Sequence, residues 1–185
     1  MLIPILISLA VVVVLFVIIV ALRPSEFRIS RSLAMAAPAE TTFEQINALR
    51  NWETWNPWAK LDPNCKMTYE GPPSGVGASY SWAGNSKVGE GRSTITESKP
   101  AELVRLRLEF FKPMQATNAA EFTCKPEGSK TIVTWTMTGK NTFIAKAFVM
   151  FLNCDKMIGG QFEKGLADLK TVAEAAARKQ PATVA

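Results

Sequence analysis

Histidine, the side chain most often used for acid–base catalysis, is absent from this sequence of 185 residues. Its absence excludes Ser-His-Asp and Cys-His catalysis and every metal site that uses a histidine ligand. The three cysteines, Cys65, Cys124 and Cys154, lie far apart in the chain, so the sequence has no CxxC or zinc-ribbon spacing. We therefore predict no metal site and no cofactor.

Carboxylates are the remaining candidates for general acids or bases, and each could act only if it were buried beside a substrate. The candidates are Glu90, Glu109, Glu121 and Asp155. Glu109 falls on the polar side of an alternating segment, and no two of the four can be assigned to one cavity. We therefore predict no catalytic residue, and a binding protein is favoured over an enzyme.

The first 22 residues form a separate, uncharged segment that is apolar except for Ser8. As a helix, this segment would be about 33 Å long, enough to cross a hydrocarbon core of about 30 Å. A cleaved signal peptide is the alternative, but it needs a basic start, a shorter apolar core and a small-x-small cleavage site. We predict an uncleaved transmembrane anchor at 1–22 and a juxtamembrane linker at 23–26.

Positive charges follow the apolar segment and predict its orientation. Arg23, Arg28 and Arg31 come after it and no basic side chain precedes it, so the positive-inside rule places the carboxyl-terminal part in the cytoplasm. Beyond these arginines, basic residues are interspersed with carboxylates despite a net charge of +5. Nucleic acid binding is therefore not expected.

Residues 27–178 read as one α+β domain, and 179–185 as a flexible tail. Apolar residues alternate in 27–35, which predicts a strand, and 39–49 has helical spacing. Later alternating segments, with turn residues and no helix between them, predict an antiparallel sheet: 78–83, 92–98, 102–111, 114–125 and 130–138. A long amphipathic helix over 157–178 would cover the apolar face of the sheet, giving a helix-grip arrangement in which the curved sheet wraps around that helix.

Six short motifs carry a resemblance to a known superfamily. The motifs are AP at Ala37-Pro38, WNPW at Trp55–Trp58, GVGASYSWAGN at Gly75–Asn85, GEG at Gly89–Gly91, GSKTIVTWTMTG at Gly128–Gly139 and FEKGLADLK at Phe162–Lys170. With these motifs in this order and at this spacing, the sequence resembles the SRPBCC superfamily. Within that superfamily it is most similar to the START-like and polyketide cyclase/dehydrase-like bacterial proteins. The resemblance implies a cavity between the sheet and the long helix that binds hydrophobic ligands. It also implies a bacterial inner membrane as the location, and it does not imply one reaction.

Strand parity then gives candidates for the wall of the implied cavity. Apolar side chains on the helix-facing side of the strands and on the facing side of the helix are expected to line it: Tyr80, Trp82, Leu106, Leu108, Phe110, Phe122, Trp135, Met137, Phe162, Leu166 and Leu169. The alternative is that the same residues form an ordinary filled core. Trp52, Trp55 and Trp58 either plug one end of the sheet or stack on a ring of the ligand.

Arg31 is the one charged candidate for a polar anchor in the cavity. It shares strand parity with the apolar residues around it, which predicts an inward side chain. The functional interpretation is an anchor for a ligand carboxylate. The alternatives are an internal ion pair, for which Glu97 is a conceivable partner, or a strand end in solvent.

The segment 141–153 is apolar on nearly every side and carries one charge, at Lys146. It is too short to span a membrane, and Asn141 or Thr142 could cap a helix there. One interpretation is a buried helix beside the pocket mouth. The other is a lid that dips into the bilayer, formed by Phe143, Phe148, Phe151 and Leu152.

Three functions remain open from the sequence. The favoured one is a single-pass membrane protein whose domain binds a lipid or another hydrophobic small molecule. The second is an enzyme of the cyclase or dehydratase type that acts on such a ligand. The third is a non-catalytic interaction module with a filled core.

Overall fold

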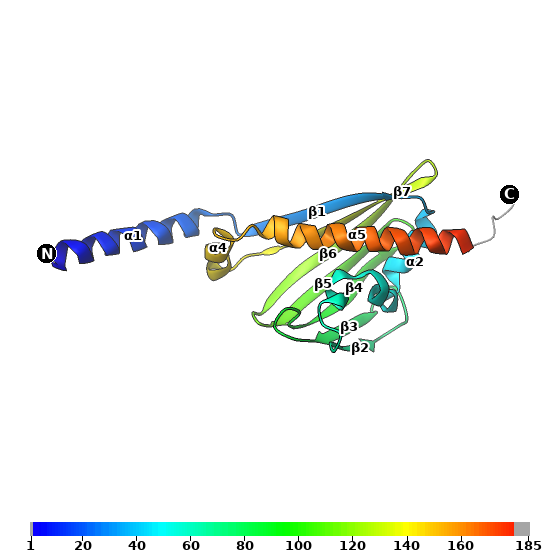
Figure 1. Ribbon diagram of the computed structural model, residues 1–185, viewed down its shortest axis with the longest axis horizontal. Helices are drawn as coiled ribbons and strands as arrows, with labels where there is room; N and C mark the ends of the chain where they lie inside the picture. The colour runs from blue at the N-terminus through cyan, green and yellow to red at the C-terminus, as the bar shows by residue number, and fades with distance from the viewer. Residues whose placement is uncertain (1, 180–185) are drawn as a thin grey trace.

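A computed structural model describes residues 2–179, and the expected tail at 180–185 lies outside the described residues. One long helix projects from a domain in which a curved sheet faces a second long helix (Figure 1). The elements are α1 (Leu2–Leu22), β1 (Glu26–Met35), α2 (Ala39–Asn47), η1 (Leu49–Asn51), α3 (Trp52–Trp55), η2 (Pro57–Lys60), β2 (Lys66–Glu70), β3 (Ser79–Ala83), β4 (Glu90–Lys99), β5 (Leu103–Lys112), β6 (Ala116–Glu127), β7 (Lys130–Lys140), α4 (Phe143–Val149) and α5 (Cys154–Lys179).

The sheet has seven antiparallel strands in the order β1-β7-β6-β5-β4-β3-β2. The predicted α+β helix-grip fold is therefore confirmed. Because all neighbours are antiparallel, the start of β1, the end of β7 and the β3–β4 and β5–β6 connections share one end of the sheet. We call this the α1 end, since Leu22 and Glu26 are separated by only a short connection.

β2 was not expected from the sequence. It is a five-residue edge strand that pairs with β3, with Met67 opposite Trp82 and Tyr69 opposite Tyr80. Its alternation covers only two apolar residues, Met67 and Tyr69, which is too short a pattern to separate from a loop.

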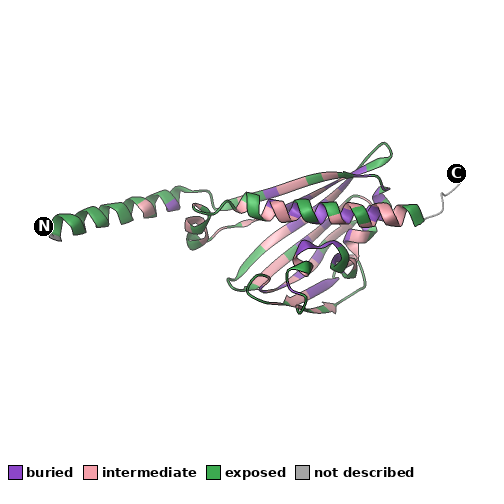
Figure 2. Cartoon of the chain, in the orientation of Figure 1, coloured by how far each residue is buried: buried purple, intermediate pink, exposed green. Residues whose placement is uncertain are grey.

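α5 lies along the inner face of the sheet and buries one stripe of its surface (Figures 1 and 2). The stripe includes Phe162, Leu166 and Leu169, each at most 1 % exposed. The helix begins three residues earlier than its apolar spacing predicts, at Cys154. The Asn153 side chain accepts a hydrogen bond of 2.9 Å from the backbone N–H of Lys156, which satisfies a free donor at the helix start.

The helical insertion between β1 and β2 closes one side of the space beneath α5. Trp52 and Trp55 are buried there, and their indole N–H groups donate to the backbone carbonyls of Ile46 (2.8 Å) and Gln45 (3.2 Å). Both bonds fasten α3 to the preceding α2. These two tryptophans therefore plug the sheet and satisfy their own polar atoms.

α1 is the one helix among residues 2–179 that is long and apolar enough to cross a membrane, and most of its surface is exposed (Figure 2). It contacts α4 and the residues that follow α4. Val20 is fully buried, and the ring of Phe16 stacks on that of Phe151 with centroids 6.4 Å apart. α4 itself is capped by Thr142, whose hydroxyl accepts from the backbone N–H of Ala145 at 3.2 Å.

Candidate functional site

A cavity of about 310 Å³ lies between the inner face of the sheet, the first turns of α5 and the helical insertion. Seven of the residues expected from strand parity line it: Tyr80, Trp82, Leu108, Phe110, Trp135, Met137 and Phe162. Its volume is at the lower end of the range typical of ligand pockets, about 300–1,000 Å³.

The wall of the cavity is largely aromatic and internally packed. The rings of Trp135 and Phe162 stack at 4.2 Å with an interplanar angle of 9°, which joins β7 to α5. Trp82 meets Phe110 edge-on at 5.7 Å and lies 5.7 Å from Tyr80. Each of these rings is therefore packed against at least one other ring of the wall.

Few polar groups reach the inner part of the cavity. Asn56 is buried, and its carbonyl oxygen accepts from the backbone N–H of Trp58 at 3.1 Å. Burial raises the pKa of Tyr80 above its ordinary value, and a hydrogen bond from Asn56 opposes that rise, so the phenol stays neutral at physiological pH. The indole N–H of Trp135 is buried with no hydrogen-bond partner in residues 2–179.

The cavity wall is more polar at the α1 end, where several of its residues are exposed to solvent, and we call this part of the wall the mouth. Ser86, Lys87 and Gly89 come from the β3–β4 connection, and Lys112 and Pro113 from the end of β5. The ammonium of Lys112 donates to Glu90 at 2.8 Å, so that this pair ties the two connections together. Gly89 has a φ of +70°, and a side chain there would collide with the backbone of Lys112.

Four of the expected lining residues do not border the cavity. Leu106, Phe122, Leu166 and Leu169 are at most 1 % exposed and belong to the solid core. They have the predicted inward orientation, but neighbouring side chains enclose them on all sides; Leu106 is opposite Ala120 in the register and still does not border the cavity. Phe122, for example, is 4.7 Å from the ring of Trp135 and 5.9 Å from that of Trp55.

Several lining residues were not expected from the sequence. Asn56, Met67, Ala120 and Ile158 border the cavity. Trp52 and Trp58 also border it, and this position is compatible with the alternative in which the tryptophan cluster contacts a ligand. Ala120 has the same inward parity as Phe122 and could have been found by that signal. Asn56 is a turn residue before a proline, and nothing in that pattern places it inside.

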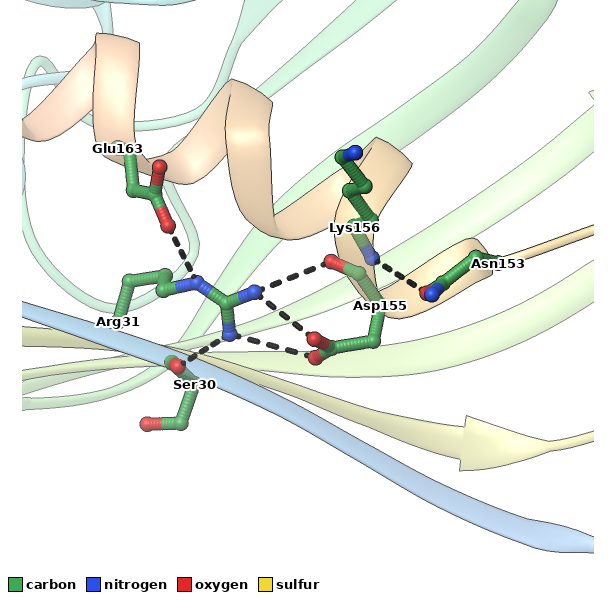
Figure 3. Close-up of polar contacts among 6 residues, drawn as sticks. All are labelled: Ser30, Arg31, Asn153, Asp155, Lys156 and Glu163. Atoms are coloured by element: carbon green, nitrogen blue, oxygen red, sulfur yellow. Dashed lines mark hydrogen bonds and ion pairs between the residues drawn. The ribbon is translucent and has the colours of Figure 1, made fainter.

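Arg31 lies on the inner face of β1, opposite Trp135 in the register, but it is occupied by carboxylates of α5 (Figure 3). Its guanidinium donates to Glu163 at 2.8 Å and to Asp155 at 2.9 Å. A third hydrogen bond, of 2.9 Å, reaches the carbonyl of Ser30. The side chain is outside the cavity wall, so the structure shows an ion-paired clamp between β1 and α5 in place of a free anchor.

Glu97, named above as a conceivable partner of Arg31, faces the other side of the sheet. The β4–β5 register shifts between Ile95, opposite Leu106, and Glu97, opposite Arg105. The extra residue at Thr96 is a β-bulge, which reverses the parity of the positions after it. Glu97 consequently pairs with Arg105 and with Lys99.

The carboxylates considered for acid–base chemistry are also elsewhere. Within residues 2–179 no Asp or Glu lines the cavity. Glu121 pairs with Arg105 at 2.6 Å, and Glu109 with Arg107 at 3.2 Å, while Glu90 and Asp155 have the partners described above. Over the same residues no group of three or more Cys, Asp or Glu side chains is placed to hold a metal ion.

The four residues of the expected lid lie beside α1 and do not line the cavity. Phe143, Phe148, Phe151 and Leu152 are all exposed, and Phe151 most of all at 77 %. They belong to α4 and to the elbow that joins it to α5. A separate open groove of about 630 Å³ follows this elbow, and Ile158 borders both the groove and the cavity.

Comparisons with known proteins identify the same architecture. No protein of curated function matches the sequence. Protein CV1439 from Chromobacterium violaceum superposes with a TM-score of 0.58 at 14 % identity, over 82 % of this chain and 99 % of that one. The solution structure of the Aha1 dimer from Colwellia psychrerythraea gives a TM-score of 0.54 at 17 % identity, over 81 % and 98 %. These similarities show the fold.

A third similar structure is the di-domain ARO/CYC protein StfQ from the steffimycin biosynthetic pathway. Its TM-score is 0.59 at 10 % identity, over 83 % of this chain and 52 % of that protein. Residues 26–174 also match the family described as polyketide cyclase / dehydrase and lipid transport. This match covers most of the sequence and nearly all of the domain that holds the cavity. The chain therefore belongs to the polyketide cyclase/dehydrase and lipid transport family and has its SRPBCC-type helix-grip fold.

Proposed function

We propose that this protein is a membrane-anchored carrier or receptor whose helix-grip domain binds a lipid or another hydrophobic small molecule. The observation that carries the proposal is the cavity of about 310 Å³ with a preformed aromatic wall. Cavities of this kind bind apolar ligands because the wall desolvates the ligand and a few polar groups orient it. The two family functions, polyketide cyclisation and lipid transport, both require such a site.

The wall chemistry defines the ligand class further. The inner surface is formed by rings and by Leu108 and Met137, and the charged residues Lys87 and Lys112 stand at the mouth. A ligand with an apolar body, deep in the cavity, and a polar or anionic end at the mouth fits this distribution. The volume suits a compact ring system or the terminal part of an acyl chain, and is too small for a whole phospholipid.

Filling the cavity tests this proposal. Ala120 is 2 % exposed and lines the cavity, so Ala120→Phe would place a ring inside it. The matched control is Ala119→Phe, one residue earlier on the same strand and on the opposite face. We expect Ala120→Phe to lose ligand binding at least tenfold and Ala119→Phe to retain it.

The measurement uses the full chain in nanodiscs with a dansyl-labelled fatty acid as the probe. Trp52, Trp58, Trp82 and Trp135 line the cavity, so energy transfer from tryptophan to dansyl reports a probe bound inside it. Equal transfer in both variants would contradict the proposal, provided that far-ultraviolet circular dichroism shows that both are folded. Native mass spectrometry of the purified chain then identifies any ligand that co-purifies.

The anchor is the second part of the proposal. We propose that α1 spans the membrane and is retained, because the domain is built against its end. Lys146 donates hydrogen bonds to the carbonyls of Ala21 (3.1 Å) and Arg23 (2.9 Å), which are free acceptors at the helix end. A cleaved signal sequence would leave α4 without this partner and without the buried Val20.

We also propose a cytoplasmic location for the domain. Arg23 and Arg28 are exposed next to the end of α1, as the positive-inside rule requires of a cytoplasmic flank. In a bacterial host, green fluorescent protein fused to the carboxyl terminus should fluoresce, and alkaline phosphatase fused there should be inactive. The reverse pattern would place the domain outside the cytoplasm.

A further inference from the structure

Exposed apolar side chains of the domain are concentrated at the α1 end. Within residues 23–179, eleven large apolar residues are exposed, and nine of them belong to three segments at this end. These segments are the β5–β6 connection with the end of β5, α4 with its elbow, and the first turn of α5. A soluble surface rarely exposes so many neighbouring apolar groups without a partner.

The contact between α1 and the elbow gives the depth of this surface. Phe16 lies six residues before the end of α1, which is about 9 Å along the helix axis. Its ring stacks on that of Phe151. If α1 fills the hydrocarbon core, Phe151 is level with the acyl chains, and the exposure of its ring is exposure to lipid.

Basic side chains border the same surface. Lys87 flanks the cavity mouth beside Lys112, whose charge is paired with Glu90, and Lys156 and Arg28 are exposed near the elbow. Cations at this level attract the anionic headgroups of a cytoplasmic leaflet, by about 1 kcal/mol each when they are close to the surface. Apolar residues surrounded by cations are the pattern of a membrane-docking surface.

We propose that the domain docks onto the bilayer that α1 spans through a docking rim made of Phe111, Met114, Phe148, Phe151, Leu152 and Met157. This inference rests on the proposed function only in that α1 is taken as a membrane span. Docking at the rim turns the cavity mouth toward the headgroup layer. The ligand then passes between membrane and cavity without crossing bulk water.

The elbow groove supplies a path for this exchange. It is bordered by β1 and by the elbow at 149–155, so one side of it belongs to the docking rim. Ile158 is the residue that the groove and the cavity share. The groove and the cavity therefore meet at Ile158, which makes this side chain a candidate gate for a ligand that enters from the acyl layer.

Photo-crosslinking of the full chain in proteoliposomes tests the docking rim. A benzoylphenylalanine at position 114 probes the β5–β6 connection, which is far from α1 in the sequence. The matched control is position 76, because Val76 and Met114 are similarly exposed, at 60 % and 55 %, and Val76 lies in the β2–β3 connection at the other end of the sheet. We expect lipid adducts at 114 in at least fivefold excess over those at 76, with more adduct when phosphatidylglycerol is included with phosphatidylcholine.

Two outcomes would overturn docking. Equal lipid adducts at 114 and 76 would mean that the β5–β6 connection does not touch the bilayer. An adduct at 114 of twice the protein mass would assign the surface to a second copy of the chain. As a second variant, Met114→Asp should lower lipid crosslinking from a benzoylphenylalanine at position 111 at least threefold, and Val76→Asp should leave it unchanged.

The failure of docking is separable from failure of the proposed function. Ala120→Phe blocks the cavity and should leave the lipid adducts at 114 unchanged. Loss of energy transfer from the dansyl probe with the adducts intact would reject ligand binding alone. Release of the protein by alkaline carbonate would reject the anchor and, with it, docking onto the bilayer, while leaving ligand binding in the cavity untouched.

Discussion

Trp135 shows how single side chains divide the interior into a core and a cavity. One face of its ring stacks on Phe162, and other contacts reach the buried Trp55 and Phe122. A residue on the core side of this ring has neighbours in every direction, while one on the cavity side has empty space on one side. Truncation of a side chain on the core side should therefore lower the free energy of unfolding more than truncation of one on the cavity side.

We predict that Phe122→Ala lowers the free energy of unfolding by about 3–5 kcal/mol, the usual cost of removing a buried phenylalanine ring. Leu108→Ala, in the half-buried cavity wall, should cost about 1–2 kcal/mol because its neighbours already border a void. Urea unfolding followed by tryptophan fluorescence measures both, since all five tryptophans belong to the domain. Equal costs would mean that the cavity is filled in solution.

The clamp at Arg31 makes stability depend on pH. The hydrogen bond from Arg31 lowers the pKa of Asp155 below its ordinary value of 3.8. The Asp155 carboxyl group therefore binds a proton more weakly in the folded protein than in the unfolded chain. The ion pair stabilises the fold fully when the pH is above the ordinary pKa of the carboxyl group. This stabilisation is lost as the pH falls through the lower pKa of the folded state. Arg31→Met should lower the urea midpoint of unfolding at pH 7. At a pH below the pKa of Asp155 in the folded protein, the same substitution should have little effect on that midpoint.

A double-mutant cycle checks the assignment to this pair. In an Asp155→Asn background, the pH-dependent part of the Arg31→Met effect should shrink, and the remainder belongs to Glu163, the second carboxylate partner of Arg31. If the effect kept its full size, Asp155 would not be responsible for it.

At the scale of elements, α5 approaches the sheet through positions without side chains. A Cβ at Gly165 would lie 2.8 Å from the ring of Trp135 and 2.9 Å from Pro57, whereas a Cβ at Gly160 would meet nothing within 4 Å. At Gly159, a side chain would collide with the guanidinium of Arg31. The same helix thus contains glycines that are needed for packing and one that is not.

We predict opposite effects for two alanine substitutions in α5. Gly160→Ala should stabilise the domain by about 0.5–1 kcal/mol, because alanine favours a helix over glycine. Gly165→Ala gains the same propensity but overpacks a rigid contact at a cost of about 1–3 kcal/mol, so its net effect should be destabilising. Thermal unfolding of the full chain in detergent compares them, and stabilisation by both would contradict the close packing of α5 on Trp135.

At the scale of the whole molecule, α1 and the domain are joined by more than the chain. Val20 is buried, and Lys146 of α4 donates to the carbonyls at the helix end. The cavity mouth and the exposed apolar residues lie at this same end. α1, the mouth and these apolar residues are therefore gathered at one end of the molecule.

We expect α1 to be retained, because its apolar length suits a membrane span. We predict that the protein isolated from membranes has the intact mass of the sequence with residues 1–22 present, and that alkaline carbonate does not extract it. A product that lacks this segment would identify it as a signal sequence. Lys146→Met should leave retention unchanged, because membrane insertion depends on the apolar length of α1 and not on its cap.

Patterns along the chain are enough to predict most of the elements. Alternating residues located β5 and β7, and the apolar stripe of Phe162, Leu166 and Leu169 located α5, because each pattern is long and follows one period. The two apolar residues of β2 form too short a pattern for the same inference. The uncharged length of α1 needs no tertiary information at all.

Parity along a strand gives the face of a side chain but not its surroundings. It placed Tyr80 and Leu106 on the same inner face, yet one lines the cavity and the other is solid core, because that difference depends on how closely α5 approaches the sheet. A single bulge at Thr96 turned Glu97 outward, and two carboxylates far away in the sequence took Arg31. The sequence by itself determined the anchor-like helix, the sheet and its covering helix. Only the tertiary structure decided where the interior stays open and which charges are already paired, because both depend on contacts between segments that the local pattern does not encode.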